Sequence, residues 1–358
     1  MPNPEGEGHV PTLEQLQNNY DRMNIDRRTT QPDIYKLLAA PPICATLMSY
    51  CDLKDRAALR KASSIFRNTV ETSRLHLKLL CIAAFGKHRH LITENLHIAY
   101  FPDEKTMKVE NVTSGRVRSV DYSGENRFEV FQRDLTTILN LERLEIERME
   151  HCCHLLPGMV DDLSVVRQNQ KQLLRVRQFE TSDLRGLRFL DSKFLDRILY
   201  VDSDNLRFTE IDEIAKMKQW KNAKELVTDQ AFRTGNFVEN FGHFDYLDYL
   251  VQEGNDVTME EVVELKNTLL RRPPTLQKIE IIATADHDHL DPLFLKAPDS
   301  FQPFQDPHDE KWYHFKYPNS SPEKMLSVRI AYTGILFKGP CFMGNKIKIE
   351  DRRFSMHY

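Results

Sequence analysis

The stretch MKQWKNAKELVT, residues 217–228, places Trp220 among several lysines. A tryptophan among cations can stack on a nucleic-acid base, anchor a protein partner or close a hydrophobic core. Apolar residues precede Trp220 at the spacing of a helix, whereas AKELVT has the composition of a strand. The stretch therefore predicts a junction between a helix and a strand. We expect the tryptophan ring to lie flat over this junction as part of the core, with lysine stems packed against it.

Short strand-like segments recur on both sides of this junction, at residues 141–148, 173–180, 196–201, 223–228, 245–251 and 276–282. Their centres lie roughly 22–32 residues apart, close to the period of leucine-rich repeats, about 20–29. A unit of one strand and one helix cannot bury its own apolar face, but stacked units share a core. The pattern predicts a parallel sheet with helices on one side, in a divergent, leucine-rich-repeat-like α/β array over residues 135–330.

Alternation along these strands separates two faces of the expected sheet. One face holds the predicted core residues Leu144, Ile146, Val176, Leu247, Ile279 and Ile281. The opposite face holds charged residues, which form the expected capture face for a protein partner: Glu145, Glu147, Arg175, Arg177, Asp248 and Glu280.

Two helices between these strands have start signals. Thr258 and Glu261 form a capping box before the apolar run that begins at Met259. Thr209 and Asp212 form an acidic variant of the same motif before IAKMKQW. We therefore expect each threonine to cap the helix that follows it.

The rest of the chain divides by composition. Residues 1–30 are predicted to be a flexible N-terminal arm, residues 31–77 a compact helical block and residues 78–134 a small antiparallel sheet. The Pro- and Asp-rich stretch that starts near residue 286 and includes KWYHF is expected to be a loop. The segments MLSVRIAYTGILFKG (residues 325–339) and NKIKIEDRRF (residues 345–354) are expected to be closing strands, and residues 331–358 are assigned to C-terminal capping strands.

The helical block resembles an F-box. The resemblance rests on Pro41-Pro42-Ile43, Leu47-Met48, Tyr50-Cys51-Asp52-Leu53, Asp55-Arg56, Leu59-Arg60-Lys61-Ala62-Ser63 and Phe66-Arg67. Pro-Pro stands where the usual pattern has Leu-Pro, and Ala62 where it often has a larger apolar residue. The resemblance implies a three-helix domain that docks on the Skp-type adaptor of a cullin–RING ubiquitin ligase. The implied adaptor-binding residues are Pro41, Pro42, Ile43, Leu47, Met48, Leu53 and Leu59.

The second half resembles the FTH domain, the F-box-associated domain of the nematode F-box A family. QWKNAKEL, residues 219–226, is very similar to the signature of that domain, and HFDYLDYL, VTMEEVVELKNTLL and LQKIEII follow its template. The signature residues, to which we assign a structural role, are Gln219, Trp220, Lys221 and Ala223. The expected fold class is thus α+β, with a three-helix F-box, a small β-rich linker region and an α/β repeat array.

Together, the two resemblances imply a substrate receptor of an SCF-type ubiquitin ligase. The F-box would hold the adaptor, and the FTH domain would capture a target protein whose identity the sequence does not reveal. Such a protein is not an enzyme. An alternative is a ligase-independent interaction scaffold with a degenerate F-box. A third reading, an RNA-binding module that uses Trp220 and its lysines, is disfavoured because the 358-residue chain has a net charge of −4.

Composition and motifs narrow the function further. Apolar residues make up 41% and charged residues 28%, values typical of a globular protein. We see no signal peptide and no apolar run long enough to span a membrane. The six cysteines lack a disulfide pattern. We therefore expect a cytoplasmic protein, with the nucleus as a second location, and no membrane or nucleic-acid partner.

Candidate metal ligands are few and badly spaced. His151-Cys152-Cys153-His154 offers consecutive ligands, whose side chains point apart, whereas zinc sites use pairs separated by two to four residues. Asp286-His287-Asp288-His289 fits a solvated turn better. No phosphate-binding loop, dinucleotide motif or nucleophile motif is present. We expect no metal and no cofactor.

Overall fold

The computed structural model describes most of the second half of the chain and a few residues of the first 70. The described residues are 48, 51, 55–56, 58–59, 67, 69–70, 73–85, 88–101, 106–121, 126–141, 143–153, 173–201, 209–228, 232–250, 257–282, 304–305, 311–318, 320–321, 323–331 and 334–342. The chain divides into two compact units, Met1–Arg74 and Leu75–Tyr358. Each unit is described by itself.

Arg56 organises the described part of the first unit. Its guanidinium donates hydrogen bonds to the backbone oxygens of Met48 (2.6 Å), Arg74 (2.8 Å) and Cys51 (3.2 Å), and to Ser73 Oγ (2.9 Å). The side chain is 3% exposed, and burial lowers its pKa. One buried cation thus ties together four backbone and side-chain groups that would otherwise need other partners.

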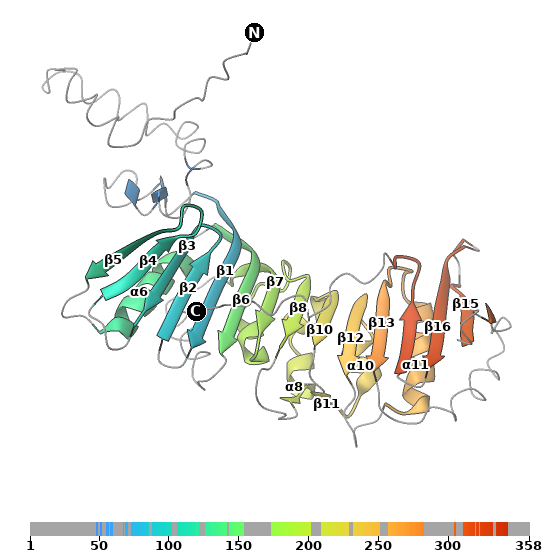
Figure 1. The fold of residues 1–358 in the computed structure, drawn as a ribbon. Coiled ribbons are helices and arrows are strands. Elements are labelled where there is room, and N and C mark those ends of the chain that lie inside the picture. The colour runs from blue at the N-terminus through green and yellow to red at the C-terminus, as the bar shows by residue number, and fades with distance from the viewer. Residues whose placement is uncertain are drawn as a thin grey trace, which may run out of the picture. The chain divides into compact units, whose positions relative to one another are not determined.

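The second unit is built on one mixed sheet of fifteen strands (Figure 1). Its N-terminal part is antiparallel: β1 (Leu75–Phe85) pairs with β2 (His88–Thr93), and β3 (Leu96–Tyr100), β4 (Thr106–Asn111) and β5 (Arg116–Asp121) follow in order. Helix α6 (Arg127–Leu139) comes next, with Asn126 as its N-cap. Tyr100 of β3 donates a hydrogen bond to Asp134 of α6 at 2.8 Å, and this contact fixes the helix on the sheet.

The middle of the sheet is parallel. β1 pairs with β6 (Leu144–Cys153), and the pairing continues in order through β7 (Arg175–Thr181), β8 (Arg197–Tyr200), β10 (Glu225–Thr228), β12 (Tyr246–Leu250) and β13 (Lys278–Ile282). The described connections contain η1 (Leu184–Phe189), α8 (Asp212–Ala215), α9 (Lys218–Asn222), α10 (Phe237–Phe241) and α11 (Met259–Arg271), with a two-strand ribbon of β9 (Thr209–Glu210) and β11 (Phe232–Arg233).

The C-terminal end of the sheet turns antiparallel again. β13 pairs with β17 (Gly334–Lys338), and then come β16 (Met325–Ala331), β15 (Lys311–Lys316) and β14 (Phe304–Gln305). The predicted closing strands over MLSVRIAYTGILFKG are confirmed as β16 and β17. The predicted loop is wrong where KWYHF forms β15, and NKIKIEDRRF lies outside the described residues.

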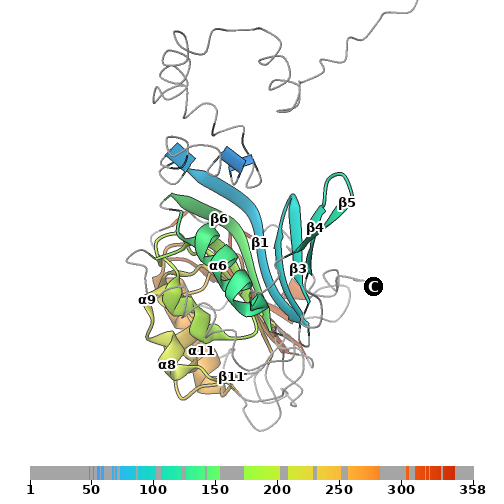
Figure 2. The same ribbon diagram turned by 90° about the vertical axis from the view of Figure 1, so that its left-hand side faces the viewer.

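A single ladder of cross-strand neighbours forms the centre of the core. Ten strands each contribute one residue that is directly opposite the next in register, and each is at most 1% exposed. The ladder runs Leu80, Met149, Phe179, Ile198, Leu226, Leu247, Ile279, Phe337, Val328, Tyr313. Helices α6, α8, α9 and α11 lie on one side of the sheet (Figure 2). We call this side the helix face, and the opposite side the polar face.

The fold class predicted from the sequence is wrong. The predicted small sheet and the predicted repeat array are not separate structures, because β1 and β6 pair in parallel over nine register positions from Leu75↔Leu144 to Ala84↔Cys153. Helices are also few: among the described α-helices only α6 and α11 have 13 residues, and the others have 4 or 5. The described part of the chain is β-rich and shows neither a three-helix block nor a helical repeat array.

The predicted domain boundaries stay predictions, and the arm at residues 1–30 lies outside the described residues, as does most of the block at 31–77. Within the described ranges, no helix combines the length and the apolar character that crossing a bilayer requires.

Candidate functional site

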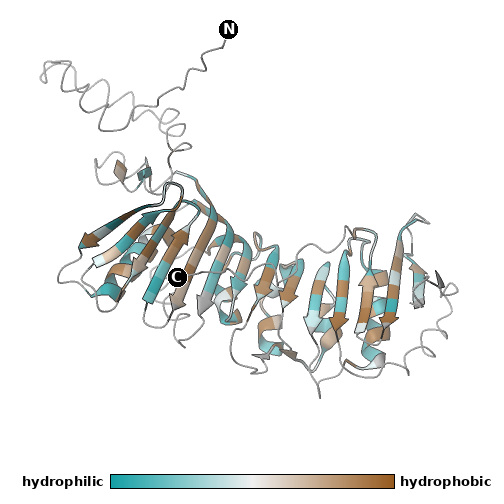
Figure 3. Cartoon of the chain, in the orientation of Figure 1, coloured by the Kyte–Doolittle hydropathy of each residue, from teal (hydrophilic) through white to brown (hydrophobic). Residues whose placement is uncertain are grey.

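Two rows of side chains lie on the polar face. Along each strand, one row comes one residue after the core ladder and the other comes one residue before it, and in β15 and β17, which run in the opposite direction, the order is reversed. Along the strands of this part of the sheet, polar and apolar residues alternate (Figure 3). The register aligns the first row as Glu150, Glu180, Leu199, Val227, Asp248, Glu280, Leu336, Arg329 and Trp312, and the second as Arg148, Gln178, Arg197, Glu225, Tyr246, Lys278, Lys338, Ser327 and His314.

Lys278 is the best-defined charged group of this face. Its ammonium lies 2.9 Å from Asp248 and 2.5 Å from Glu280, and 5.5 Å from the centre of the Tyr246 ring. The side chain is 6% exposed. Burial alone would lower the pKa of Lys278, but the hydrogen bonds to Glu280 and Asp248 outweigh it, and the pKa is raised. The lysine is therefore a permanent cation that holds two carboxylates in place.

Two further cations of the second row lie on β8 and β6. Arg197 lies 3.2 Å from Glu225, and Arg148 lies 2.6 Å from Glu150 and 2.8 Å from Glu180. Removing one member of such a half-buried or buried pair leaves an uncompensated charge. These pairs therefore fix which side chains lie together, although the intact pairs add little net stability. The polar face is thus a preorganised array of charges.

An apolar cluster separates the charged groups. Leu199, Val227 and Tyr246 pack together on β8, β10 and β12, and each is at most 4% exposed. Burial and the nearby Asp248 carboxylate, which accepts a hydrogen bond from the Tyr246 hydroxyl at 2.9 Å, raise the pKa of Tyr246 to about 12. Since its hydroxyl stays protonated, Tyr246 holds the Asp248 carboxylate in place through this hydrogen bond.

The predicted division of the strands into two faces is confirmed. The predicted core residues are all at most 5% exposed: Leu144, Ile146, Val176, Leu247, Ile279 and Ile281. Four of the predicted capture residues form pairs on the polar face. Glu145 lies 3.5 Å from Arg175, and Asp248 and Glu280 both bind Lys278. Arg177 contacts Asp196 at 3.4 Å, and Glu147 is exposed. Their role in capture stays a prediction.

The structure places Trp220 in the core, as predicted. The ring is 0% exposed, its indole N–H donates to the backbone oxygen of Asn240 at 2.8 Å, and it packs edge-on against Phe232, Phe241 and Phe244. The continuous helix expected before it is wrong, because the backbone is extended at Met217 and separates α8 from α9. A ring buried in this way has no face left for a base, which removes the basis of the RNA-binding reading.

The other signature residues support the same junction. The Gln219 amide donates to the backbone oxygen of Leu190 at 2.8 Å, and Ala223 is 2% exposed where α9 ends. Lys221 is exposed. Three of the four signature residues therefore have structural contacts that explain their type.

Of the seven predicted adaptor-binding residues, two are described. Met48 is 1% exposed, and Leu59 is half-buried. The remaining five lie outside the described residues: Pro41, Pro42, Ile43, Leu47 and Leu53. Adaptor binding by this set stays a prediction, although the burial of Met48 makes it a poor contact residue.

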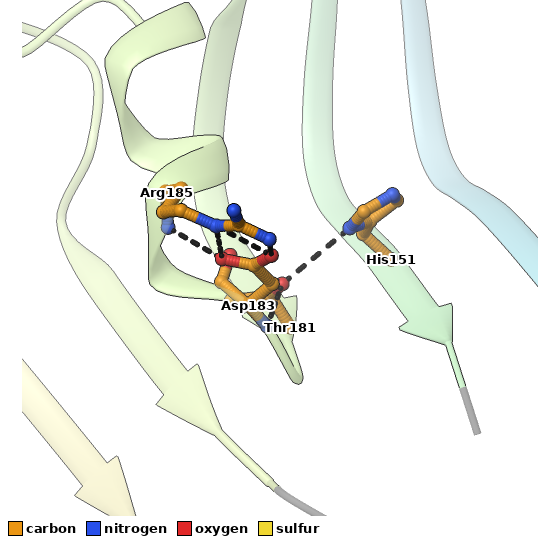
Figure 4. A network of polar contacts seen from close by, with 4 residues as sticks. All are labelled: His151, Thr181, Asp183 and Arg185. Carbon is orange, nitrogen blue, oxygen red and sulfur yellow. Dashed lines mark hydrogen bonds and ion pairs between the residues drawn. The ribbon is translucent and has the colours of Figure 1, made fainter. Parts of the chain in front are cut away.

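His151, the first residue of the candidate metal cluster His151-Cys152-Cys153-His154, is buried among other side chains. His151 is 0% exposed on β6, its Nδ1 lies 3.5 Å from Thr181 Oγ1, and its ring stacks on Phe179. Beyond Thr181, the Asp183 carboxylate caps η1 and binds the Arg185 guanidinium (Figure 4). Within the described ranges, no three His, Cys, Asp or Glu residues come together as metal ligands. Asp286-His287-Asp288-His289 and His154 lie outside them.

Sequence reasoning missed the polar-face residues at the C-terminal end of the sheet. Trp312, Arg329 and Lys338 come together from β15, β16 and β17, and Lys338 lies 4.8 Å from the centre of the Trp312 ring. The alternation of KWYHFK, with Tyr313 and Phe315 on one side, is the signal that could have identified the first of these strands.

Comparison with known proteins assigns part of the chain. Residues 160–296, which include β7 to β13, match the model of the FTH domain. No match to an F-box is detected over residues 31–77. Curated proteins and solved structures contain no match to the chain. The region that carries Trp220 and the Lys278 cluster thus lies within the match to the FTH domain, a family associated with F-box proteins.

Proposed function

We propose that this chain is a substrate receptor of an SCF-type cullin–RING ubiquitin ligase. The match of residues 160–296 to the FTH domain is the observation that carries the proposal, because this family is associated with F-box proteins. In this role residues 31–77 bind the Skp-type adaptor, and the FTH domain captures the target protein. The role belongs to the cytoplasm, with the nucleus as a second location.

The chain contributes proximity rather than chemistry in this proposal. Holding a target beside the charged ubiquitin carrier replaces a bimolecular encounter by a reaction at high effective concentration. The polar face supports the capture role because its charges are already oriented by neighbouring strands, so binding need not order them.

Co-expression with a Skp-type adaptor tests the proposal. The tagged full-length chain is expected to retain the adaptor through gel filtration, and Leu47→Asp is expected to abolish this co-purification by placing a charge in the predicted apolar contact. Leu47 is preferred to Met48, since Met48 is 1% exposed and its replacement would disturb packing.

Leu173→Asp is the matched control, because Leu173 is 45% exposed and lies in the second unit. It should leave adaptor binding unchanged. Failure of the wild-type chain to retain the adaptor, or equal retention by Leu47→Asp, would contradict the ligase role.

A ligase-independent scaffold is the second candidate. It is favoured by the absence of a detected F-box and by Pro41 and Ala62, which depart from the usual F-box pattern. A scaffold predicts protein partners that bind equally to wild type and Leu47→Asp, with no ubiquitination of those partners when the ligase is reconstituted. Ubiquitination that depends on Leu47 would exclude it.

A further inference from the structure

The C-terminal strands β15, β16 and β17 carry a second group of side chains on the polar face. In the first row Leu336 lies opposite both Glu280 and Arg329, and Arg329 lies opposite Trp312. In the second row, Lys338 lies between Lys278 and Ser327. We call Trp312, Arg329, Leu336 and Lys338 the tryptophan patch.

Aromatic rings hold the two cations of the tryptophan patch. The Lys338 ammonium is 4.8 Å from the centre of the Trp312 ring and 4.7 Å from that of Phe342, so it stands between two rings. The Arg329 guanidinium is 5.8 Å from the Trp312 ring. Trp312, Arg329 and Lys338 are all half-buried. Side chains restrained in this way lose less conformational entropy when a ligand binds.

A cavity of about 240 Å³ adjoins one of the two cations, Arg329. Arg329, Leu336 and Glu280 line it, together with Ile281, Ile282, Gly334 and Ile335. Its volume is far above the ~10–15 Å³ that one water needs. Ile282, one of the lining residues, is 41% exposed and can contact a ligand. The Glu280 carboxylate is turned to Lys278, at 2.5 Å, so one charge in the lining is already neutralised.

We propose that the tryptophan patch and its cavity bind an extended acidic segment of a partner protein. A large aliphatic side chain of that segment fills the cavity, and two carboxylates separated by one residue bind Arg329 and Lys338. The spacing supports this ligand. Arg329 and Lys338 are diagonal neighbours across two strands, about 7–8 Å apart at the backbone, and alternate residues of an extended chain are about 6.6–6.8 Å apart.

A peptide fits this surface better than a nucleic acid. The cavity is lined mainly by aliphatic residues, which suit an aliphatic side chain of a peptide better than a phosphate or a sugar. This inference rests on the proposed function, in which the acidic segment would belong to the captured target.

Selection of a random peptide display library on the immobilised full-length chain tests the inference. The enriched peptides are expected to share two acidic positions separated by one residue, with a large aliphatic residue nearby. A labelled peptide of that consensus should bind at least about tenfold more weakly to Arg329→Gln/Lys338→Gln, since both peptide carboxylates lose their cationic partners. Ile282→Ser should weaken the same peptide and leave the acidic preference intact.

Lys108→Gln is the matched control, because Lys108 also lies over an aromatic ring, 4.6 Å from the centre of Phe101, but on β4. It should bind the peptide as wild type does. Selection of no consensus, selection of a basic one, equal binding by the double variant, or stronger retention of single-stranded RNA than of the peptide would each overturn the inference. The adaptor is absent from this experiment, so its outcome is independent of adaptor binding.

Discussion

At the scale of single residues, Trp220 is surrounded by lysines in the sequence but by aromatic rings in the fold. The lysines around it suggested a binding site, yet the ring is enclosed by Phe232, Phe241 and Phe244 at centroid distances of 5.3–6.3 Å. Its single polar atom is satisfied by the backbone of Asn240. Edge-to-face packing of this kind adds about 0.5–1.5 kcal/mol per pair beyond burial of area.

Replacing Trp220 by alanine is expected to lower the free energy of unfolding by about 3–5 kcal/mol, because it leaves a cavity in an aromatic cluster and an unsatisfied backbone oxygen. Urea unfolding followed by circular dichroism measures the change. Lys221→Ala, at an exposed neighbour on the same helix, should stay within about 0.5 kcal/mol of wild type. Unchanged unfolding of Trp220→Ala would mean that the ring does not support the fold.

Gly334 is a second residue whose type is required by its surroundings. Its φ of 144° is a backbone conformation that side-chain-bearing residues rarely adopt. A Cβ atom added there would lie 2.1 Å from the backbone oxygen of Ile281, on the neighbouring strand β13. Only glycine allows β17 to begin at this distance from β13.

Gly334→Ala should therefore destabilise the protein by about 2–3 kcal/mol and weaken pairing of β13 with β17. Hydrogen exchange of the amides in these two strands, measured by mass spectrometry, should increase. Gly115→Ala is the comparison: Gly115 also has a positive φ, but nothing lies within 4 Å of its added Cβ. Its smaller cost, from backbone strain alone, should leave exchange in β13 unaffected. Equal exchange in both variants would refute the steric argument.

At the scale of elements, the two expected helix starts had opposite outcomes. Thr258 caps α11 in a complete capping box: its hydroxyl accepts from Glu261 N, and the Glu261 carboxylate accepts from Thr258 N at 2.8 Å. Thr209 instead belongs to the short strand β9, and α8 begins after Ile211 without a side-chain cap. Asp212 accepts hydrogen bonds from Thr234 and Asn240.

Thr258→Ala is expected to reduce stability by about 1 kcal/mol, since it removes the hydroxyl that satisfies an amide at the start of α11. Thr258→Ser keeps that oxygen and should cost less than half as much. Thermal unfolding of the three proteins provides the measurement. A serine variant as unstable as the alanine variant would show that the cap contributes nothing.

At the scale of the whole molecule, the core ladder joins strands that differ in direction and lie far apart in the sequence.

Two histidines that are enclosed by the fold, His243 and His90, link the stability of the protein to pH. Burial is the main cause that lowers the pKa of His243 to about 4. Burial, with the nearby His97 and His88, also lowers the pKa of His90 to about 4. In the unfolded chain both should titrate near 6.5.

The unfolded state therefore binds more protons between these values, and stability must fall as pH decreases from about 6.5 to 4. We expect His243→Gln to reduce the loss of unfolding free energy between pH 7 and pH 5, while an exposed control, His76→Gln, should not. Urea titrations at both pH values test this. Parallel losses in wild type and His243→Gln would show that His243 takes up no proton on unfolding.

The individual strands and the division of their faces were predictable because alternation is a local property. Ile146 and Val176 were assigned to the core correctly. The next core residues, Met149 and Phe179, lie three positions further on, so the alternation shifts by one residue at this point in both strands. The sequence carries this shift as two polar residues between the apolar ones in each strand, and the strands keep one register through it.

By itself, the sequence determined the burial of Trp220, the capping box of α11, the two faces of the central strands and the resemblance to the FTH domain that the comparison supports. Only the tertiary structure decided that β1 pairs with β6, which joins all these strands into one sheet, and that Trp312, Arg329 and Lys338 share a surface. The physical reason is range. Capping and alternation depend on residues a few positions apart, whereas strand order depends on contacts between segments far apart in the chain, whose closure entropy and packing no local pattern encodes.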